Sequence, residues 1–396
     1  MATESHIRIE GGTLVTPTEL SPQASLWISG DRIAGVGGPE PYAAEWQVVD
    51  AAGAYVAPGL IDVHVHGGKG SDVMDATVGD GQVVTEYHAE GGTTSLLATL
   101  GTDSLENLLS MVRAAADARC VTSDGAKILG AHVEGRYFNM EKKGCHLERY
   151  ITNPNPAETE QLLELADEIA WITLAPELPG SEAFVRALVD RGIIVSAGHS
   201  TATFNQTVEA MGWGLSHTTH LYCAMSSTLK TPPKKEGGVI EASLLHDELT
   251  TEIIADGVHL PPELMKLSFK CKGAEGLVLV TDAARGAGMP DGDYIFGRKE
   301  EGMPIVVRNG IATVPDLSGY ASSTIQMIDT LDIACNVIGT TLVEAVTMAT
   351  LTPARILGAD KAIGSLEVGK QADVVVFDDT FTVRRTYVDG REVYAA

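Results

Sequence analysis

The two ends of the chain share one hydrophobic pattern, and the long middle has another. Runs in which apolar and polar residues alternate, typical of β-hairpins, fill the first fifty-odd and the last forty residues. They are IRIEGGTLVTP, SLWISGDRIAGVG and WQVVDAAGAYVAP near the start, and ADVVVFD and RRTYVDGREVYAA near the end. The last run contains a Val-Asp-Gly turn signal. We expect the two ends to pack together as one small β-sandwich.

In the middle, short apolar runs alternate with amphipathic, helical stretches. Eight of these runs are typical of buried strands: LIDVHVH, TTSLLATL, KILGAHVEG, IAWITLAPE, GIIVSAGHS, LSHTTHL, TEIIADGVHL and GLVLVTDAA. Eight strand–helix units favour a closed barrel, because a doubly wound open sheet usually needs fewer. Two segments interrupt the pattern, a Pro/Lys-rich loop around 226–238 and a hairpin-like segment near 290–316.

The predicted fold class is therefore α/β. A (β/α)8 TIM barrel is expected over residues 57–359. A β-sandwich domain is expected from residues 1–56 together with 360–396.

Composition narrows the function classes. The 396 residues are 44% hydrophobic and 20% charged, which excludes a disordered chain. Lys+Arg 28 against Asp+Glu 53 gives 28 − 53 = −25, a net charge that repels nucleic acids and anionic membranes. We expect neither a nucleic-acid partner nor a membrane, since no apolar run approaches the roughly 20 residues that cross a bilayer. The five scattered cysteines, and an N-terminus without a secretory signal pattern, favour the cytoplasm.

Side chains that can bind metals recur where the predicted strands end. In a (β/α)8 barrel the C-terminal ends of all strands meet at the face that carries the active site. His64 and His66 are two residues apart, so both side chains project to the same side of the first strand. The whole set is His64, His66, Glu134, His199, His220, His259 and Asp282. A single histidine after a strand is usually only a satisfied polar residue, but the recurrence indicates a metal site.

Five other histidines lack this placement. They are His6, His88, His132, His217 and His246, and we expect structural or surface roles for them. Of these, His217 lies on the sixth strand, three residues before His220.

A divalent ion such as zinc or iron, held by these ligands, suits hydrolysis of an amide, an ester or a cyclic imide. It lowers the pKa of bound water and polarises a carbonyl oxygen. A carboxylate that is not needed as a ligand can take the water's proton and pass it to the leaving nitrogen. Asp282 is the candidate for that role; alternatively it is a plain metal ligand or a helix N-cap.

Several motifs resemble the amidohydrolase superfamily and, more narrowly, the N-acetylglucosamine-6-phosphate deacetylases. They are APGLIDVHVHG at 57–67, HVEGRYFNMEKKGCH at 132–146, AGHSTA at 197–202, THLYCAM at 219–225, ADGVHL at 255–260 and LVTDA at 279–283. The tail TPARILGADKAIGSLEVGKQADVVVFD resembles the superfamily's C-terminal signature. The resemblance spans nearly the whole chain.

The resemblance implies roles for individual residues. Glu134, His199 and His220 match the metal ligands that all members share, whereas His64 and His66 match a pair found in members that can hold a second ion. One or two divalent ions are therefore expected. Asp282 matches the proton shuttle. The expected substrate contacts are Cys145, His146, Cys223, Ala224, Lys235, His259, Leu317, Ser318 and Gly319.

Four departures from the family pattern fall on the substrate side. Arg136 replaces a proline, and Cys223 replaces an asparagine whose amide can both donate and accept hydrogen bonds. The run Lys234–Gly238 replaces the context of a phosphate-clamping arginine, and lysine binds phosphate only as a point charge. GYASST at 319–324 is longer than the usual Gly-Ser-x-x-Thr pattern.

A phosphate ligand on so acidic a protein requires local positive charge. The candidates are Arg136, Lys142, Lys143, Lys230, Lys234 and Lys235, although loops also carry lysines with no such role. In the family the inserted loop around 226–238 tends to complete the neighbouring subunit's site, which implies a homodimer.

Three functions remain open. The first is metal-dependent hydrolysis of the acetamide of an N-acetylated amino sugar phosphate, taking N-acetylglucosamine 6-phosphate to glucosamine 6-phosphate and acetate. The second keeps the mechanism and changes the substrate to N-acetylgalactosamine 6-phosphate, an N-acyl amino acid, a dipeptide or a cyclic amide; Cys223 and the missing arginine favour it. The third is an inactive barrel that only binds, which the complete ligand set disfavours.

Overall fold

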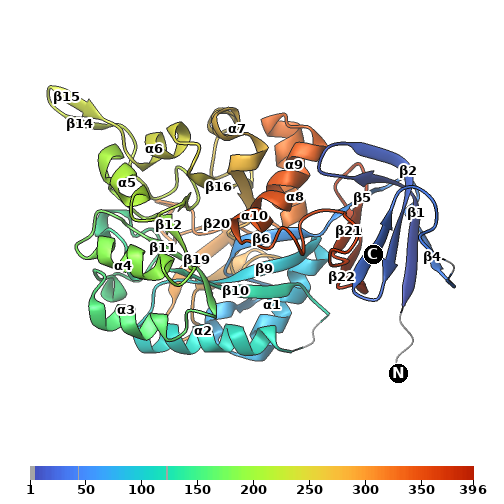
Figure 1. The fold of residues 1–396 in the computed structure, drawn as a ribbon. Helices are drawn as coiled ribbons and strands as arrows, with labels where there is room; N and C mark the ends of the chain where they lie inside the picture. Colours follow the sequence, from blue (N-terminus) through green and yellow to red (C-terminus); the bar gives the residue numbers. More distant parts are fainter. Residues whose placement is uncertain (1–4, 43, 122–123) are drawn as a thin grey trace.

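The computed structural model describes residues 5–42, 44–121 and 124–396. A barrel with surrounding helices forms the larger part of the molecule. A sheet built from the two ends of the chain lies beside it, with the first strands in blue next to the last strands in red (Figure 1).

Eight parallel strands form the barrel, and each of the eight runs predicted from the sequence overlaps one of them. They are β6 (Leu60–Val65), β9 (Thr93–Leu100), β10 (Lys127–Glu134), β11 (Ile169–Leu174), β12 (Ile194–Ala197), β13 (His217–Thr218), β16 (Thr250–Ile254) and β17 (Leu277–Val280). The last strand returns to the first, because the backbone N–H of Asp282 donates to the carbonyl of His64 at 2.8 Å and that of His66 donates to Ala283 at 2.9 Å. The predicted barrel is confirmed.

Helices cover the outside of the barrel, and polar side chains cap the N-termini of five of the ten described α-helices. They are α1 (Val78–Glu90), α2 (Leu105–Arg119), α3 (Pro156–Leu163), α4 (Ser181–Val189), α5 (Phe204–Met211), α6 (Val239–Leu245), α7 (Pro262–Gly276), α8 (Met327–Ile333), α9 (Leu342–Ala349) and α10 (Leu351–Ile356). The side chains of Thr77, Ser104 and Asn155 accept backbone N–H groups in the first turns of α1, α2 and α3. Short turns of helix lie at η1 (Val73–Asp75), η2 (Met140–Lys142), η3 (Glu148–Tyr150) and η4 (Ala334–Ile338).

The two ends of the chain form one mixed sheet of eight strands. Its strands are β1 (His6–Val15), β2 (Leu20–Ser29), β3 (Arg32–Val36), β4 (Gln47–Asp50), β5 (Tyr55–Pro58), β21 (Val374–Phe377), β22 (Val383–Val388) and β23 (Arg391–Ala395). Antiparallel pairing of β5 with β21 joins the N-terminal and C-terminal halves. Ile33, near one edge, and Tyr387, near the other, belong to one buried cluster, so the sheet curls around a core of its own. The ends pack together as predicted, while the domain boundaries at 56/57 and 359/360 stay a prediction.

Three small antiparallel sheets lie in segments that follow barrel strands. β14 (Leu229–Thr231) and β15 (Lys234–Glu236) pair in the predicted Pro/Lys-rich loop and project away from the body of the molecule (Figure 1). β18 (Gly292–Phe296), β19 (Met303–Arg308) and β20 (Ile311–Thr313) form a three-stranded sheet in the second predicted insertion. β7 (Gly67–Gly68) and β8 (Ser71–Asp72) pair just after the first barrel strand. Within the described ranges, no helix has both the length and the apolar character needed to span a membrane.

Candidate active site

A cavity of about 340 Å³ lies at the C-terminal ends of the barrel strands. Most of the residues predicted for the site line it, namely His66, Glu134, Cys145, His146, His199, His220, Cys223, Ala224, His259 and Asp282. A larger hollow of about 750 Å³ lies between α3 and α4, but none of the predicted site residues lines it. The chemistry therefore points to the smaller cavity, whose volume is within the usual range for small-molecule sites, roughly 300–1,000 Å³.

Glu134, at the end of β10, is the centre of the buried cluster. Its Oε1 lies 3.2 Å from His199 Nε2 and 3.0 Å from His220 Nε2, and these two nitrogens are 3.1 Å apart. Ligand atoms on a tetrahedral zinc ion with bonds of 2.0–2.1 Å are separated by about 3.3 Å. The three atoms are therefore close enough together to share one ion.

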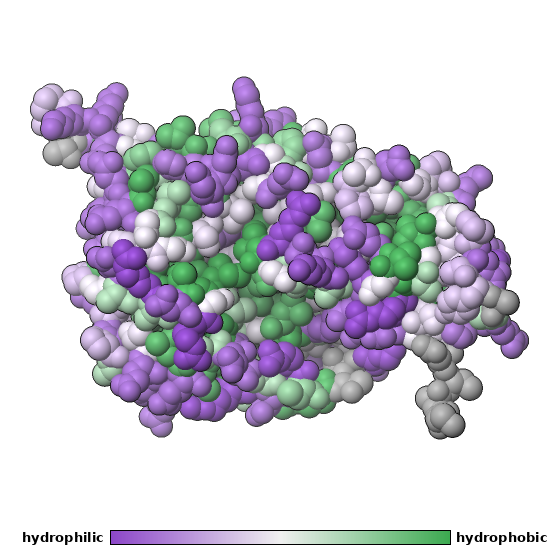
Figure 2. Space-filling model, in the orientation of Figure 1, coloured by the Kyte–Doolittle hydropathy of each residue, from purple (hydrophilic) through white to green (hydrophobic). Residues whose placement is uncertain are grey.

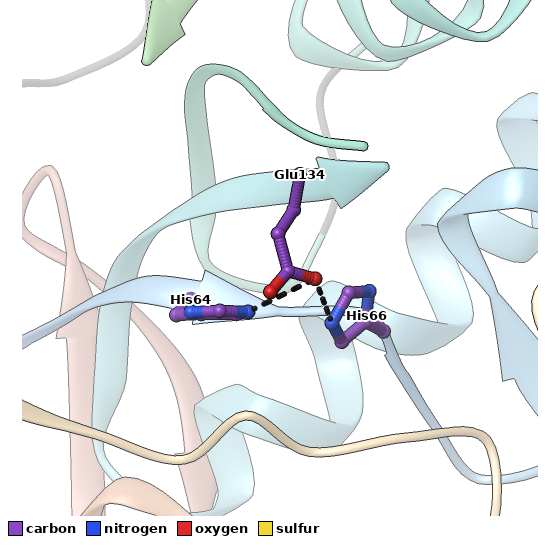
Figure 3. A group of neighbouring side chains, drawn as sticks. All are labelled: His64, His66 and Glu134. Carbon is purple, nitrogen blue, oxygen red and sulfur yellow. Dashed lines mark ion pairs between the residues drawn. The ribbon is translucent and has the colours of Figure 1, made fainter. Parts of the chain in front are cut away.

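The other carboxylate oxygen of Glu134 faces the first-strand pair. Glu134 Oε2 lies 3.6 Å from His64 Nε2 and 3.3 Å from His66 Nε2, so the carboxylate stands between the two rings (Figure 3). Asp282 closes this second group, with its Oδ1 at 3.6 Å from His64 Nε2 and 3.2 Å from His66 Nε2. Glu134 thus bridges two adjacent groups of ligand atoms.

Backbone conformation aims three of these side chains. His199, His220 and Asp282 follow the ends of β12, β13 and β17 with φ of +49°, +30° and +48°, in the left-handed region that non-glycine residues rarely adopt. Such strain is kept where the surrounding structure enforces it, and it clusters at functional sites. The turns bring all three side chains to the cavity.

The hydrogen bonds of the rings separate metal ligands from other histidines. Nδ1 of His66 lies 3.1 Å from the carbonyl of Thr99, and Nδ1 of His199 lies 2.7 Å from the carbonyl of Lys142. A carbonyl can only accept, so Nδ1 carries the proton and the Nε2 lone pair is free for a metal. His146 is the opposite case, because its Nδ1 accepts the backbone N–H of Thr102, so that Nε2 carries the proton, 3.5 Å from Glu134 Oε2.

The charges of the side chains around Glu134 also favour a bound cation. Burial alone would lower the pKa of His66, but hydrogen bonds to Asp282 and Glu134 raise it to about 9. Burial lowers the pKa of His199 to about 4, although its bond to Glu134 opposes that shift. His64 Nε2 is buried and has no hydrogen-bond partner among the described residues. Two buried carboxylates require a positive charge beside them; a proton on His66 Nε2 supplies it when no metal is bound, and a divalent ion at the same place would replace that proton.

The predicted substrate contacts differ in how firmly neighbouring groups orient their side chains. Asp256 orients His259 through an Oδ2–Nδ1 contact of 2.7 Å, and its Oδ1 accepts the backbone N–H of His259. Burial raises the pKa of the Cys145 thiol and raises that of Cys223 to about 12, so both thiols are neutral near pH 7. Both thiols line the cavity as small neutral groups.

Four predicted substrate contacts lie outside the cavity lining. Lys235 is exposed on the projecting hairpin, and Leu317, Ser318 and Gly319 lie in an exposed loop, where Leu317 is 72% exposed. Their roles stay a prediction. Tyr320 and Ser322, a few residues further along the same segment, line the cavity instead.

Arg136 is not available as a phosphate cation. Its guanidinium pairs with Glu158 at 2.9 Å and donates to the carbonyl of Asp103 at 2.7 Å, and the residue is only 8% exposed. Of the candidate cations, Lys142 alone lines the cavity within the part of the chain that the structure describes.

Sequence reasoning missed two further contributors. Phe296, at the end of β18, lines the cavity and packs edge-on against His66 with ring centroids 4.8 Å apart. Glu252, on β16, lies 2.5 Å from His64 Nδ1 and is fully buried. Burial would raise the pKa of Glu252, but His64 and His217 lower it, so it is a carboxylate. Its signal was present in the sequence, as the one charged residue in the strand TTEII.

Comparison with known proteins agrees with this geometry. Residues 55–393 match the amidohydrolase family. The N-acetylglucosamine-6-phosphate deacetylase of Vibrio furnissii is 35% identical over 86% of this chain and 83% of its own length. The N-acetylgalactosamine-6-phosphate deacetylase of Escherichia coli O157:H7 is 34% identical over 85% of this chain and 87% of its own length.

Solved structures give the same result. The crystal structure of N-acetylglucosamine-6-phosphate deacetylase from Pasteurella multocida superposes with a TM-score of 0.91 and 32% identity, over 99% of this chain and all of that one. The chain belongs to the amidohydrolase family and, within it, to the N-acetylglucosamine-6-phosphate deacetylases.

Proposed function

We propose that this protein hydrolyses the acetamide of N-acetylglucosamine 6-phosphate, releasing glucosamine 6-phosphate and acetate. The observation that carries the proposal is the Glu134 carboxylate, which bridges two groups of ligand atoms beside Asp282 in a cavity large enough for a hexosamine. The relatives' names supply the substrate class. An inactive binding barrel has no observation in its favour.

Different residues around the cavity have different roles in the reaction. A divalent ion bound at Glu134, His199 and His220 would lower the pKa of a water molecule and polarise the acetyl carbonyl. The Asp282 carboxylate takes the proton of the attacking water and returns it to the amide nitrogen as the bond to carbon breaks. The hydroxyl of Ser322 donates to Asp282 Oδ1 at 3.2 Å and fixes its orientation.

The other cavity residues bind and orient the sugar. His259, fixed by Asp256, presents its Nε2, and His146 also lines the cavity, with its proton on Nε2. Phe296 is an apolar wall over His66 that excludes water from the first-strand side.

The metal centre, in this proposal, holds two zinc or iron ions. The support is the second group of atoms, His64, His66 and Asp282 with Glu134, all buried and within 3.6 Å of a carboxylate oxygen. Imidazole and carboxylate ligands suit both metals.

The assembly, in this proposal, is a homodimer in which the β14–β15 hairpin reaches the partner's cavity. The hairpin extends from the body of its own chain and is strongly hydrophilic (Figures 1 and 2). Lys235 would then meet the phosphate of a substrate bound in the partner. The five free cysteines agree with a reducing compartment such as the cytoplasm.

A competing substrate has a specific observation behind it. A relative that is 34% identical is named for N-acetylgalactosamine 6-phosphate, and Cys223 lacks the amide of the family's usual asparagine. The epimer, or an N-acyl compound that is not a sugar, is therefore the second candidate.

One experiment separates these candidates. Zn²⁺-loaded protein is incubated with N-acetylglucosamine 6-phosphate, its galactosamine epimer, unphosphorylated N-acetylglucosamine and an N-acetyl amino acid, and acetate release is measured. We expect the highest kcat/KM for N-acetylglucosamine 6-phosphate. Release from none of the phosphorylated sugars would overturn the proposal, and preference for the epimer or the amino acid would establish the second candidate.

A further inference from the structure

Glu252 is a buried carboxylate that the proposed reaction does not use. It lies on β16 with no exposed surface and is absent from the cavity lining, so it cannot touch a substrate. A buried carboxylate is costly unless its oxygens are paired. Its partners therefore identify its role.

One oxygen of Glu252 contacts both ligand groups of the centre. Glu252 Oε1 lies 2.5 Å from Nδ1 of His64 and accepts the backbone N–H of His220 at 2.9 Å. His64 belongs to the first-strand pair, whereas His220 belongs to the group around Glu134 Oε1. The same atom thus fixes a ring in one group and the backbone of a ligand in the other.

The contact decides which nitrogen of His64 can bind a metal. A carboxylate can only accept, so Nδ1 carries the proton and Nε2 turns its lone pair toward Glu134 and Asp282, 3.6 Å away in both cases. His66 and His199 are oriented by neutral carbonyls instead. His64 is the ligand with a charged partner, and a carboxylate on the far nitrogen raises the basicity of a ligating imidazole.

The other oxygen of Glu252 faces the buried ring of His217. His217 Nε2 lies 3.6 Å from Glu252 Oε2, and His217 Nδ1 lies 2.6 Å from the hydroxyl of Thr250. Trp171 packs edge-on against the His217 ring with centroids 4.6 Å apart. The 3.6 Å separation is too long for a hydrogen bond, so Oε1 is the oxygen through which Glu252 is hydrogen-bonded to the metal-binding residues.

We infer that Glu252 is a positioning residue that makes the first-strand pair competent for a second divalent ion and couples that position to His220. The inference rests on the proposed metal centre. It predicts that loss of Glu252 weakens the second ion before the first, because Glu134, His199 and His220 keep their side chains, whereas His64 loses the contact that orients its ring.

The test is a Zn²⁺ titration in competition with a chelating dye, with ions per chain counted by elemental analysis. Glu252→Ala removes both contacts, whereas Glu252→Gln keeps an acceptor of the same shape and removes the charge. Thr251→Val is the matched control, because it removes a buried hydroxyl bond to Thr218 from the neighbouring residue of the same strand. His66→Ala provides the reference for a protein with one ion.

We expect two tight ions in the wild type and in Thr251→Val, and one in His66→Ala. Outer-shell substitutions typically cost 10- to 100-fold in metal affinity, so Glu252→Ala should bind the second ion about 100-fold more weakly and Glu252→Gln about 10-fold. If Glu252→Ala does not fold, Glu252→Gln alone decides. Wild-type affinity for both ions in the variant that folds would overturn the inference.

The same titration would give a different result if the proposed metal centre itself were wrong. A wild-type chain that binds no Zn²⁺ would reject the metal centre itself, and one that binds a single ion would reject the second position. A wild-type chain with two ions and a Glu252 variant with two equally tight ions would reject only the role of Glu252.

Discussion

The floor and the mouth of the cavity are built in different ways. At the floor, His64, Glu134 and His199 are 0%, 2% and 5% exposed, and each is oriented by a named contact. At the mouth, Leu317 is 72% and Tyr320 49% exposed, and Lys235 stands on a hairpin outside the barrel. The floor is buried and held by contacts within the chain, whereas the mouth is exposed.

The floor and the mouth differ because their side chains come from different parts of the fold. Floor residues follow parallel strands whose register fixes their relative positions, so the reacting bond meets a rigid frame. Mouth residues come from insertions and loops, which tolerate sequence change more easily. The departures at Cys223 and at 234–238 fall on this side, so changes at the floor should alter turnover and changes at the mouth should alter substrate binding.

Metal removal should have the largest effect. Treatment with a strong chelator is expected to abolish acetate release, and added Zn²⁺ should restore it. The thermal midpoint should fall as well, since a ligand present at 1,000 times its Kd stabilises the folded state by about 4 kcal/mol. Calorimetry with and without Zn²⁺ measures this shift. Full activity in metal-free protein would contradict a floor built around an ion.

The substitution Asp282→Asn should have the second-largest effect on activity. The amide keeps the shape and still meets Ser322, but it cannot take a proton, so kcat should fall by about 10²- to 10⁴-fold. KM and the ion held by Glu134, His199 and His220 should change little. Steady-state kinetics with metal analysis on the same preparation tests both statements. Unchanged kcat would reject Asp282 as the proton acceptor.

These two regions also differ in what the sequence could predict. The strand ends predicted the floor, because all C-terminal ends of a parallel barrel converge, and His64, Glu134, His220 and Asp282 do meet there. Glu252 was missed because it reaches His64 past the intervening strand β17, and contacts between alternate strands inside a barrel leave no local pattern.

At the mouth, the local sequence did not predict which side chains reach the cavity. Arg136 was a candidate for phosphate binding, but Glu158 pairs with it from α3, 22 residues along the chain. The position of 317–319 depends on how an inserted sheet and its following loop settle, and that of Lys235 on a hairpin that leaves its own barrel. Hydrophobic periodicity does not encode either arrangement.

Lys235→Ala tests the mouth across the proposed dimer. If Lys235 binds the phosphate, KM for N-acetylglucosamine 6-phosphate should rise about tenfold with kcat unchanged, as for loss of a charged hydrogen bond. Rates on the unphosphorylated sugar should not change. Lys234→Ala is the matched control, since neighbouring residues of a strand point to opposite faces.

The dimer itself adds a second measurement to this test. Dilution below the dimer dissociation constant should raise the wild-type KM for the phosphorylated sugar toward that of Lys235→Ala. A KM that is independent of protein concentration and of Lys235 would leave Lys142, which lines the cavity of its own chain, as the remaining cation.

Cys223→Asn should have the smallest effect and the opposite sign. The neutral thiol of Cys223 is a weak hydrogen-bonding group, and an amide there would add one hydrogen bond to the sugar, worth about 0.5–1.5 kcal/mol. We expect kcat/KM for N-acetylglucosamine 6-phosphate to rise up to about tenfold. Cys223→Ala is the control, because it removes the thiol without adding an amide. A lower rate on that sugar in Cys223→Asn, with Cys223→Ala unchanged, would mean that this mouth has been shaped for a substrate with a different pattern of hydroxyl groups, while the floor beneath it stays the same.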